Sequence, residues 1–368
     1  MPEAQRKIPC NEPLTGSYAP EDCLFLLKPI PAQYHSIENK EQLIQSGQLH
    51  YSEMIHKESP PTQEYSNLFL HMTEQYKTRL AKEIMSLAKL IAEKRTGNIT
   101  LLSLARAGTP IGVLLQRALT QLLHRKSAHY SISIIRDKGI DDNALDYVLD
   151  QGHDPNSIVF IDGWTAKGVI SKELHQAIAS YNHSREVFIA PELFVVSDIG
   201  GTADVQATFD DYTIPSALMN STVSGLVSRS ILNEQIGPLD FHGCVQYQHL
   251  RSHDLSVWFV DEVFKEMRTD DLTPGIQESK SSRRQITKAF LDRIQSDYAV
   301  SDINRIKPGI AEATRVLLRR VPDQLLIRHF GHVDTQHLER LALEKSVPVR
   351  EISDMPFGAC ALIKDVLK

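Results

Sequence analysis

Cysteine is scarce in this chain of 368 residues, which contains only Cys10, Cys23, Cys244 and Cys360. The four form no Cys-x-x-Cys pair and have no histidine at zinc-ligand spacing, so the sequence predicts neither a disulfide framework nor a structural zinc site. No run of 18 apolar residues occurs, and the first residues lack the apolar stretch of a signal peptide. We therefore expect a cytoplasmic protein with no membrane partner.

Two well-known phosphate-binding patterns are also absent. The sequence has neither the Gly-x-x-x-x-Gly-Lys-Ser/Thr pattern of a P-loop nor the Gly-x-Gly-x-x-Gly fingerprint of dinucleotide-binding proteins. Its formal net charge of −6 excludes a protein that coats nucleic acid over its whole surface. The charge is uneven, however, because residues 280–368 contain 16 Lys and Arg against 11 Asp and Glu. The two ends of the chain are therefore expected to meet different partners.

The first two thirds of the chain change pattern once. Residues 1–65 are rich in Pro, Gln, Ser and Glu without a sustained period, which predicts an irregular N-terminal arm. Across residues 66–268, apolar runs alternate with helical stretches, the runs lying at 99–105, 130–135, 157–162 and 193–197 and the helices near 73–97, 110–123 and 169–181. This alternation predicts an α/β domain with a mainly parallel sheet and helices on both faces. Two more helices are expected near 215–232 and 254–268.

The last third has its own organisation. Residues 269–285 mix Pro, Gly, Ser and charges, which is typical of a linker. The segment 286–368 then predicts a small C-terminal α/β sandwich. Its expected helices lie at 286–296, 309–320, 334–345 and 358–367, and its expected strands at 324–328 and 347–352.

One strand-to-helix loop has residues suited to an anion. The apolar strand ends at Asp162, and Thr165, Ala166, Lys167 and Gly168 lead into a helix from about Val169. A helix N-terminus with a hydroxyl and an ammonium nearby suits a phosphate. Asp162 could accept hydrogen bonds from ribose hydroxyls or help to hold Mg²⁺ through water. The alternative is a plain turn with an aspartate cap and a glycine for tightness.

A second loop has the same design. The strand at 99–105 is followed by Ala105, Arg106, Ala107, Gly108 and Thr109, with Pro110 suited to the first turn of a helix. Arg106 and the exposed amides could clamp a diphosphate. Because ligands sit beyond the carboxyl ends of parallel strands, the two loops are predicted to grip opposite ends of one phosphorylated ligand. Two unrelated turns are the alternative.

These segments resemble a known family. SLARAGTPIG resembles the pyrophosphate loop of type I phosphoribosyltransferases, and VFIDGWTAKG resembles their 5-phosphoribosyl-1-diphosphate (PRPP) loop. Together with YSISIIRDKGID and DDYTIPSALMNSTVSGLVSRSIL, the resemblance spans about residues 50–268 and is strongest to the StiP-type phosphoribosyltransferase-like proteins of tellurite-resistance and stress operons. It implies a type I phosphoribosyltransferase-like fold. It also implies that PRPP is bound by residues 105–109 and by Asp162, Gly163, Trp164, Thr165, Ala166, Lys167 and Gly168.

The resemblance further implies a phosphoribosyltransferase that uses PRPP and Mg²⁺ to form an N-glycoside of a nucleobase-like acceptor. Asp162 would hold the metal, Arg106 would stabilise the departing diphosphate and Asp137 is a candidate base, unless its segment is only a solvated charged turn. The polar residues expected to form the acceptor pocket, for which close helix packing is the alternative, are Asp211, Tyr212, Asn220, Ser221, Thr222 and Arg229. Two departures from the family pattern affect these expectations: the usual acidic pair is reduced to Asp162, and Lys167 replaces a common glycine.

The tail resembles a pelota-type RNA-binding domain through the helix start Gly309, Ile310, Ala311, Glu312 and Ala313. The resemblance implies RNA contacts by a basic surface, against the alternative of a merely solvated face, through Lys307, Gly309, Glu312, Arg315 and Arg319. Ala311 stands where relatives often have an asparagine that reads a base. Two other functions stay open: a non-catalytic regulator that senses PRPP or a nucleotide and binds RNA, and a cysteine protease that uses Cys244 near His242 and His249.

Overall fold

The computed structural model describes residues 12–270 and 279–367. Its central sheet has the strand order β1 (Leu24–Phe25), β4 (Ser127–Ile132), β3 (Ile99–Leu104), β7 (Ile158–Thr165), β8 (Leu193–Asp198) and β9 (Val205–Thr208). Every neighbouring pair in this sheet is parallel. An α/β protein with a mainly parallel sheet is therefore confirmed, whereas the finer assignment to a type I phosphoribosyltransferase fold stays a prediction.

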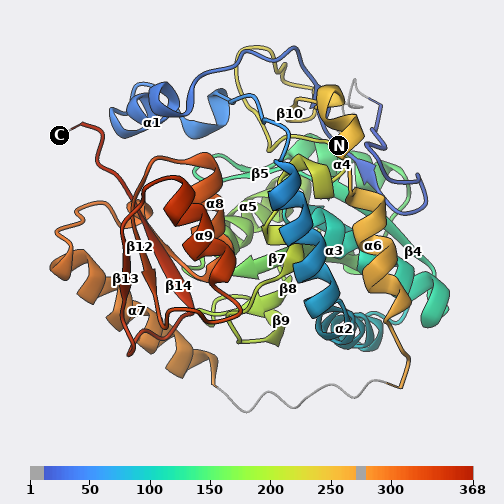
Figure 1. Ribbon diagram of the computed structural model, residues 1–368. Helices are drawn as coiled ribbons and strands as arrows, with labels where there is room; N and C mark the ends of the chain where they lie inside the picture. The colour runs from blue at the N-terminus through green and yellow to red at the C-terminus, as the bar shows by residue number, and fades with distance from the viewer. Residues whose placement is uncertain (1–11, 271–278, 368) are drawn as a thin grey trace.

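Helices cover both faces of the sheet (Figure 1). Leu101 belongs to the core formed with α2 (Gln63–Lys94), α3 (Thr109–Arg117) and α6 (Ser256–Lys265). Its neighbour Leu102 belongs to the opposite core, formed with α4 (Asp142–Asp150) and α5 (Val169–Arg185). Because both sides of the strand are buried, its sequence is a continuous apolar run. Across the described ranges, no helix is long and apolar enough to cross a membrane.

The strand order fixes where a ligand can bind. Strand β3 lies between β4, which follows it in sequence, and β7, which comes after a return past β3. The direction of winding therefore reverses between β3 and β7, and open α/β sheets bind ligands at such a reversal, beyond the carboxyl ends of the strands. Arg106 follows β3, and residues 162–168 form the end of β7 and the turn into α5. The two predicted loops thus flank the reversal.

The C-terminal part is a second sheet with its own core. Its strand order is β11 (Ile306–Pro308), β14 (Ala359–Ile363), β12 (Pro322–Ile327) and β13 (Val349–Glu351). Helices α8 (Ile310–Arg319) and α9 (Gln336–Glu344) pack on one face, and α7 (Lys280–Asp297) packs on the other. This part lies beside the central sheet at its β7 to β9 side (Figure 1).

The N-terminal arm contacts distant parts of the chain. Strand β2 (Lys28–Pro29) of the arm pairs with β10 (Gly243–Cys244). Outside the arm, the short strands β5 (Ile134–Ile135) and β6 (Gly139–Ile140) pair with each other. Helix α1 (Ile37–Gln45) lies against the C-terminal part, where Gln45 Oε1 accepts a hydrogen bond from Val366 N at 3.0 Å. The described part of the arm, residues 12–65, therefore contacts both the central sheet and the C-terminal part.

Two predicted helices are wrong. Residues 215–232 contain only 3₁₀ turns at Pro215–Ala217 and Ser221–Val223, because their Ser, Thr and Asn side chains compete for backbone groups and Gly225 adopts a positive φ of 80°. The segment 358–367 contains β14, a central strand of the second sheet. A short apolar run that is buried on both faces has no period that separates a strand from a helix.

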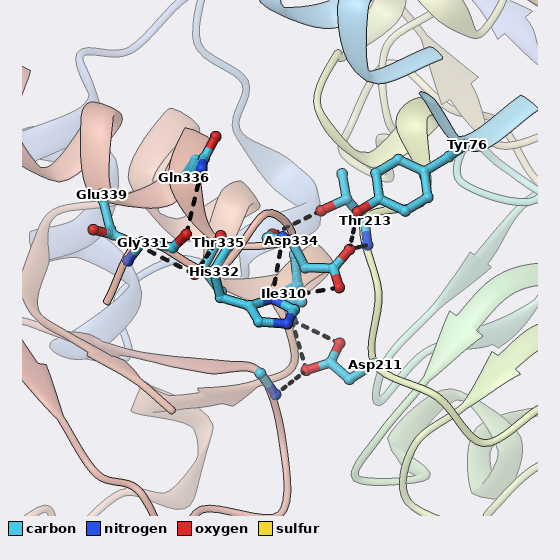
Figure 2. A network of polar contacts seen from close by, with 11 residues as sticks. Tyr76, Asp211, Thr213, Ile310, Gly331, His332, Asp334, Thr335, Gln336 and Glu339 are labelled. Atoms are coloured by element: carbon cyan, nitrogen blue, oxygen red, sulfur yellow. Dashed lines mark hydrogen bonds and ion pairs between the residues drawn. The ribbon is translucent and has the colours of Figure 1, made fainter. Parts of the chain in front are cut away.

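A polar network joins the two sheets (Figure 2). The carboxylate of Asp211 accepts hydrogen bonds from Ile310 N at 2.9 Å and from Gly358 N at 2.8 Å. Asp334 accepts from the Tyr76 hydroxyl and from Thr213 N, and its carbonyl accepts from Thr213 Oγ1 at 2.7 Å. Asp211 therefore satisfies the first free amide of α8 and the amide of Gly358 just before β14, a role different from the predicted wall of an acceptor pocket.

Candidate functional site

A cavity of about 520 Å³ lies where the carboxyl ends of β3 and β7 face the C-terminal part. Its lining includes residues of the N-terminal arm, the two predicted loops, and β11 with α8, together with Arg136, Arg229 and Tyr247 from other segments. The residues that carry the argument below are Lys40, Glu58, Arg106, Arg136, Asp162, Trp164, Lys167, Arg229, Lys307, Glu312, Arg315 and Arg319. The two predicted loops thus contribute to one shared cavity.

The loop after β3 contributes mainly its arginine. Arg106 donates to Glu58 Oε1 at 2.5 Å and to Val227 O at 2.9 Å. Gly108 is packed so tightly that an added Cβ would lie 2.4 Å from Ile161 O. Thr109 is buried and pairs with Ser131 Oγ at 2.7 Å. The turn itself is therefore closed by packing, and Arg106 is the group from residues 105–109 that lines the main cavity.

The loop after β7 surrounds the other side. Asp162 Oδ1 accepts from Gly163 N at 2.7 Å, and burial raises the pKa of this carboxyl to about 7. Lys167 Nζ donates to the carbonyls of Ile303 and Ile306 at 2.8 and 2.9 Å. Its ammonium is thus directed to the C-terminal backbone, a position different from the phosphate contact expected from the sequence. Thr165 and Ala166 also line the cavity, and Gly168 begins α5 with a φ of 73°.

The predicted RNA contacts face this cavity. Lys307, Glu312, Arg315 and Arg319 all line it. Arg315 pairs with Glu312 at 2.8 Å and lies over the Trp164 ring at 4.4 Å from its centroid, while Trp164 Nε1 donates to Glu312. Although burial opposes ionisation, Arg315 and Lys307 lower the pKa of Glu312 to about 2. These side chains are therefore paired with one another at the cavity, and their predicted contact with RNA stays a prediction.

Sequence reasoning missed the contribution of the N-terminal arm. Glu58 is buried and binds Arg106 as well as Ser221, whose hydroxyl donates to Oε2 at 2.6 Å. Lys40 is also buried, lines the cavity and contacts His56 Nδ1 at 3.2 Å. Burial first, and Arg229 next, lower the pKa of Lys40 to about 7. No local pattern marks either residue, because their partners are remote in sequence.

Several predicted residues lie elsewhere. Asp137 is exposed and pairs with Arg136 at 2.9 Å, outside the cavity lining. Tyr212 is buried and donates to Glu83. Ser221 and Thr222 are buried, whereas Asn220 lines a narrow cleft next to the main cavity. Among the six predicted acceptor-pocket residues, Arg229 lines the main cavity, where it donates to Tyr51 O and Met54 O.

The three cysteines that the structure describes are buried away from solvent. Cys23, Cys244 and Cys360 are fully buried, and burial raises the pKa of the Cys244 thiol to about 12. His242 Nδ1 pairs with Ser133 Oγ at 2.7 Å, and His249 Nε2 pairs with Glu58 O at 2.9 Å. A nucleophilic cysteine needs an accessible thiolate beside a base, and Cys244 lacks both in this conformation. Cys10 lies outside the described residues.

The residues around Asp162 do not fit a resident Mg²⁺. The part of the chain that the structure describes holds no group of three His, Cys, Asp or Glu that could bind a metal ion. Glu312 is the acidic neighbour that raises the pKa of Asp162, but Arg315 acts on both carboxyls. A cation in this position weakens a site for a divalent metal. The predicted role of Asp162 as a metal ligand stays a prediction, and no step is derived through Mg²⁺.

Comparison with known proteins decides the family. A family described as "Tellurite-like stress resistance cysteine protease StiP" matches residues 16–264, and a "PELOTA RNA binding domain" matches residues 285–365. The cysteine protease StiP of Acinetobacter baylyi is 38% identical to this chain, and the match covers 96% of this chain and 95% of that protein. The chain belongs to the StiP family. The StiP-type and pelota-type resemblances are thereby confirmed.

The same findings correct the predicted activity. The StiP family model and the Acinetobacter StiP protein are both named as cysteine proteases, so the prediction of a phosphoribosyltransferase for this StiP-family chain is wrong. Both names support the third function considered from the sequence, a cysteine protease. Strand-end loops of a parallel sheet do not specify one reaction, because such loops recur with many functions on related folds.

Proposed function

We propose that this StiP-family chain binds a small anionic ligand in the cavity between its two sheets. The observation that carries the proposal is the charge of the lining. Ten described Lys and Arg side chains and five Asp and Glu side chains line the cavity. Burial holds the pKa of Asp162, Lys40 and Lys167 each near 7, so the excess of positive charge at neutral pH rests on the other eight basic and four acidic side chains. A concave site with excess positive charge attracts anions more strongly than an exposed surface does.

The size of the cavity favours a small molecule over a nucleic-acid strand. A volume of about 520 Å³ lies within the range of about 300–1,000 Å³ that small-molecule sites occupy. The described lining comes from several segments that surround the ligand space, whereas an RNA helix needs an open surface to reach phosphates. The match to an RNA-binding domain supports RNA as a further partner, and an RNA oligonucleotide therefore belongs in the test.

Calorimetric titration of the full chain tests the proposal. The probes are pyrophosphate, tripolyphosphate and a single-stranded RNA of ten nucleotides, each at low and high salt. We expect tripolyphosphate to bind, with an affinity that falls as salt rises. Arg136→Glu, in the cavity lining, should weaken binding about tenfold or more. Arg293→Glu, on the surface of α7 beside Asp354, is the matched control and should bind as the unchanged protein does.

Two results would contradict the proposal. One is the absence of binding to either polyphosphate. The other is RNA binding that tolerates Arg136→Glu, which would place the anionic partner on an outer surface instead.

A second candidate, cysteine-dependent peptide hydrolysis, is favoured by the family description and by the name of the Acinetobacter relative. Since the three described cysteines are fully buried, this activity requires either Cys10, which lies outside the described residues, or a conformation in which another thiol becomes accessible. Release of peptides from denatured casein by the full chain measures it. Under this candidate, release is abolished by one of four single substitutions: Cys10→Ala, Cys23→Ala, Cys244→Ala or Cys360→Ala. Iodoacetamide should abolish release by the unchanged protein. Release that survives all four substitutions would exclude a cysteine nucleophile.

A further inference from the structure

We propose that Arg106, Arg315 and Arg319 form an oxyanion subsite at the inner end of the cavity, built jointly by the central sheet and helix α8. The inference rests on the proposed function and deepens it, because it names the part of the ligand that this end receives. That part is a compact, multiply charged oxyanion such as a terminal phosphate group.

The position of the three arginines is the first support. Arg106, Arg315 and Arg319 line the main cavity and also line the narrow cleft that adjoins it. Arg106 follows β3, whereas Arg315 and Arg319 occupy successive turns on one face of α8. The cleft holds about 10 Å³, so a ligand group from the main cavity ends at this point. The trio therefore closes one end of the ligand space.

The second support is the number of local carboxylates. Arg106 pairs with Glu58 at 2.5 Å, and Arg315 pairs with Glu312 at 2.8 Å. For Arg319, no carboxylate lies within ion-pair distance among the residues that the structure describes. Its neighbour Arg320, in contrast, makes two hydrogen bonds of 2.6 and 2.7 Å to Glu41. Two of the three arginines thus have a carboxylate partner, and Arg319 has none among the described residues.

The third support comes from hydrogen-bond donors. The Nε atoms of Arg106, Arg315 and Arg319 are all buried without a hydrogen-bond acceptor in the described structure. Buried donors without partners are rare in folded proteins and each costs about 1–3 kcal/mol or more when charged. Ser216 Oγ, in the adjoining cleft, is also buried without a partner. An oxyanion with several acceptor oxygens satisfies donors that converge from different directions.

The electrostatics of Arg319 agree with this arrangement. Burial, followed by the neighbouring Arg106 and Arg315, lowers the pKa of Arg319 well below its ordinary value, and Glu58 and Glu312 offset the effect only in part. A guanidinium stays protonated in proteins, so the lowered pKa reports an unfavourable position for a charge that persists. Binding of a dianion removes this repulsion. Anion binding also couples the docking of α8 to the ligand, because Arg106 belongs to the central sheet and Arg319 belongs to α8.

The sign of a stability change distinguishes this subsite from a structural arginine. Arg319→Gln removes an uncompensated charge, so without added anion the variant should melt at the same temperature as the unchanged protein or higher. Addition of tripolyphosphate should raise the melting temperature of the unchanged protein. The same addition should leave Arg319→Gln nearly unshifted, with an affinity at least tenfold weaker by calorimetry.

Two further variants make the test specific. Arg320→Gln, at the residue that follows the end of α8, deprives the fully buried Glu41 of its partner and should lower the melting temperature without anion, opposite in sign to Arg319→Gln. Arg293→Gln, an exposed arginine on α7, should change neither quantity. Together they separate loss of a subsite from loss of positive charge in general.

Failure of this inference is distinguishable from failure of the proposed function. If the unchanged protein binds no polyphosphate, the anionic-ligand function itself is wrong. If the unchanged protein binds tripolyphosphate and Arg319→Gln binds it equally well, the cavity takes an anion but the arginine trio is not its subsite. A lowered melting temperature of Arg319→Gln without anion, combined with unchanged affinity, would identify Arg319 as a structural residue.

Discussion

Glu58 and Asp162 line the same cavity, but the pKa values of their carboxyl groups differ widely. Burial disfavours the charged form of both. Glu58 has Arg106 within 2.5 Å and Ser221 as a donor, and these partners lower its pKa to about 2. Asp162 accepts one hydrogen bond from Gly163 N and has a pKa of about 7. The partners of each carboxyl, and not its residue type, therefore decide its charge at neutral pH.

The first prediction concerns Asp162→Asn. Because the folded-state pKa of Asp162 is raised to about 7 from an ordinary value of 3.8, the unfolded chain loses this proton first as pH rises. Folding is therefore penalised increasingly between about pH 4 and pH 7, and fully above pH 7. The variant lacks this penalty, so it should be more stable by about 1–2 kcal/mol at pH 8 and equally stable near pH 4. Urea unfolding at both pH values measures this. A variant less stable than the unchanged protein at pH 8 would show that the carboxylate is favourably paired there.

Among the secondary-structure elements, α8 has the most demanding position. Its N-cap residue is Gly309, whose φ is 96°, and an added Cβ there would lie 2.5 Å from Ile199 Cδ1 of the neighbouring part. The helix carries Arg315 and Arg319 into the cavity and is held at its start by Asp211. The conformational freedom of one glycine thus allows the close approach that completes the cavity.

The second prediction concerns Gly309→Ala. We expect a loss of about 2–4 kcal/mol in the free energy of unfolding, because the substitution strains the backbone and collides with Ile199. Gly331→Ala is the matched control, since Gly331 has a φ of 69° and open space around its hypothetical Cβ. That variant should lose only about 1 kcal/mol. Chemical denaturation compares the two, and equal losses would mean that the contact with Ile199 carries no energy. Adding Ile199→Val to Gly309→Ala should restore part of the stability.

Elements with a clear period or long apolar runs could be predicted from the sequence, and short segments set by distant contacts could not. Strands β3, β7 and β8 were recognisable because both of their faces are buried. Strand β14 has the same burial but follows Gly358 in a run that also fits a helix, and only its pairing with β11 and β12 decides the matter. Pairing between remote strands leaves no local signal.

The candidate site was predictable to a similar extent. Arg106 and Asp162 could be placed at one cavity, because parallel strands bring their carboxyl ends to the same edge. Glu58 could not be found, since its buried ion pair with Arg106 depends on how the N-terminal arm folds back. The orientation of Arg315 and Arg319 was also beyond the sequence, which shows a basic helix face but not the surface that covers it. Their role as RNA contacts stays a prediction.

At the scale of the whole molecule, the two sheets meet both at the cavity and at the network around Asp211 and Asp334. Asp211 is buried and accepts from two amides of the C-terminal part, while Asp334 of that part accepts from Tyr76 and Thr213. Buried residues of both parts, Ala166 and Ile199 on one side and Phe357 on the other, share one apolar cluster. Polar and apolar contacts thus hold the cavity walls in place without a ligand.

The last prediction tests whether this junction makes the molecule one cooperative unit. The double variant Asp211→Ala and Asp334→Ala leaves the amides of Ile310 and Gly358 without their acceptor and removes the Tyr76 contact. Unpaired buried amides cost about 1–3 kcal/mol each. A loss of this size should weaken the contact between the two sheets enough to uncouple their unfolding. We expect the unchanged protein to unfold in one calorimetric transition and the double variant in two, with the α8-containing part melting first. Asp354→Ala, which breaks only the exposed pair with Arg293, should keep one transition. A single transition at lower temperature in the double variant would show that the apolar cluster alone couples the sheets.

Tripolyphosphate should then draw the two transitions of the double variant together, because an anion held by Arg106 and Arg319 binds only when both walls are in place.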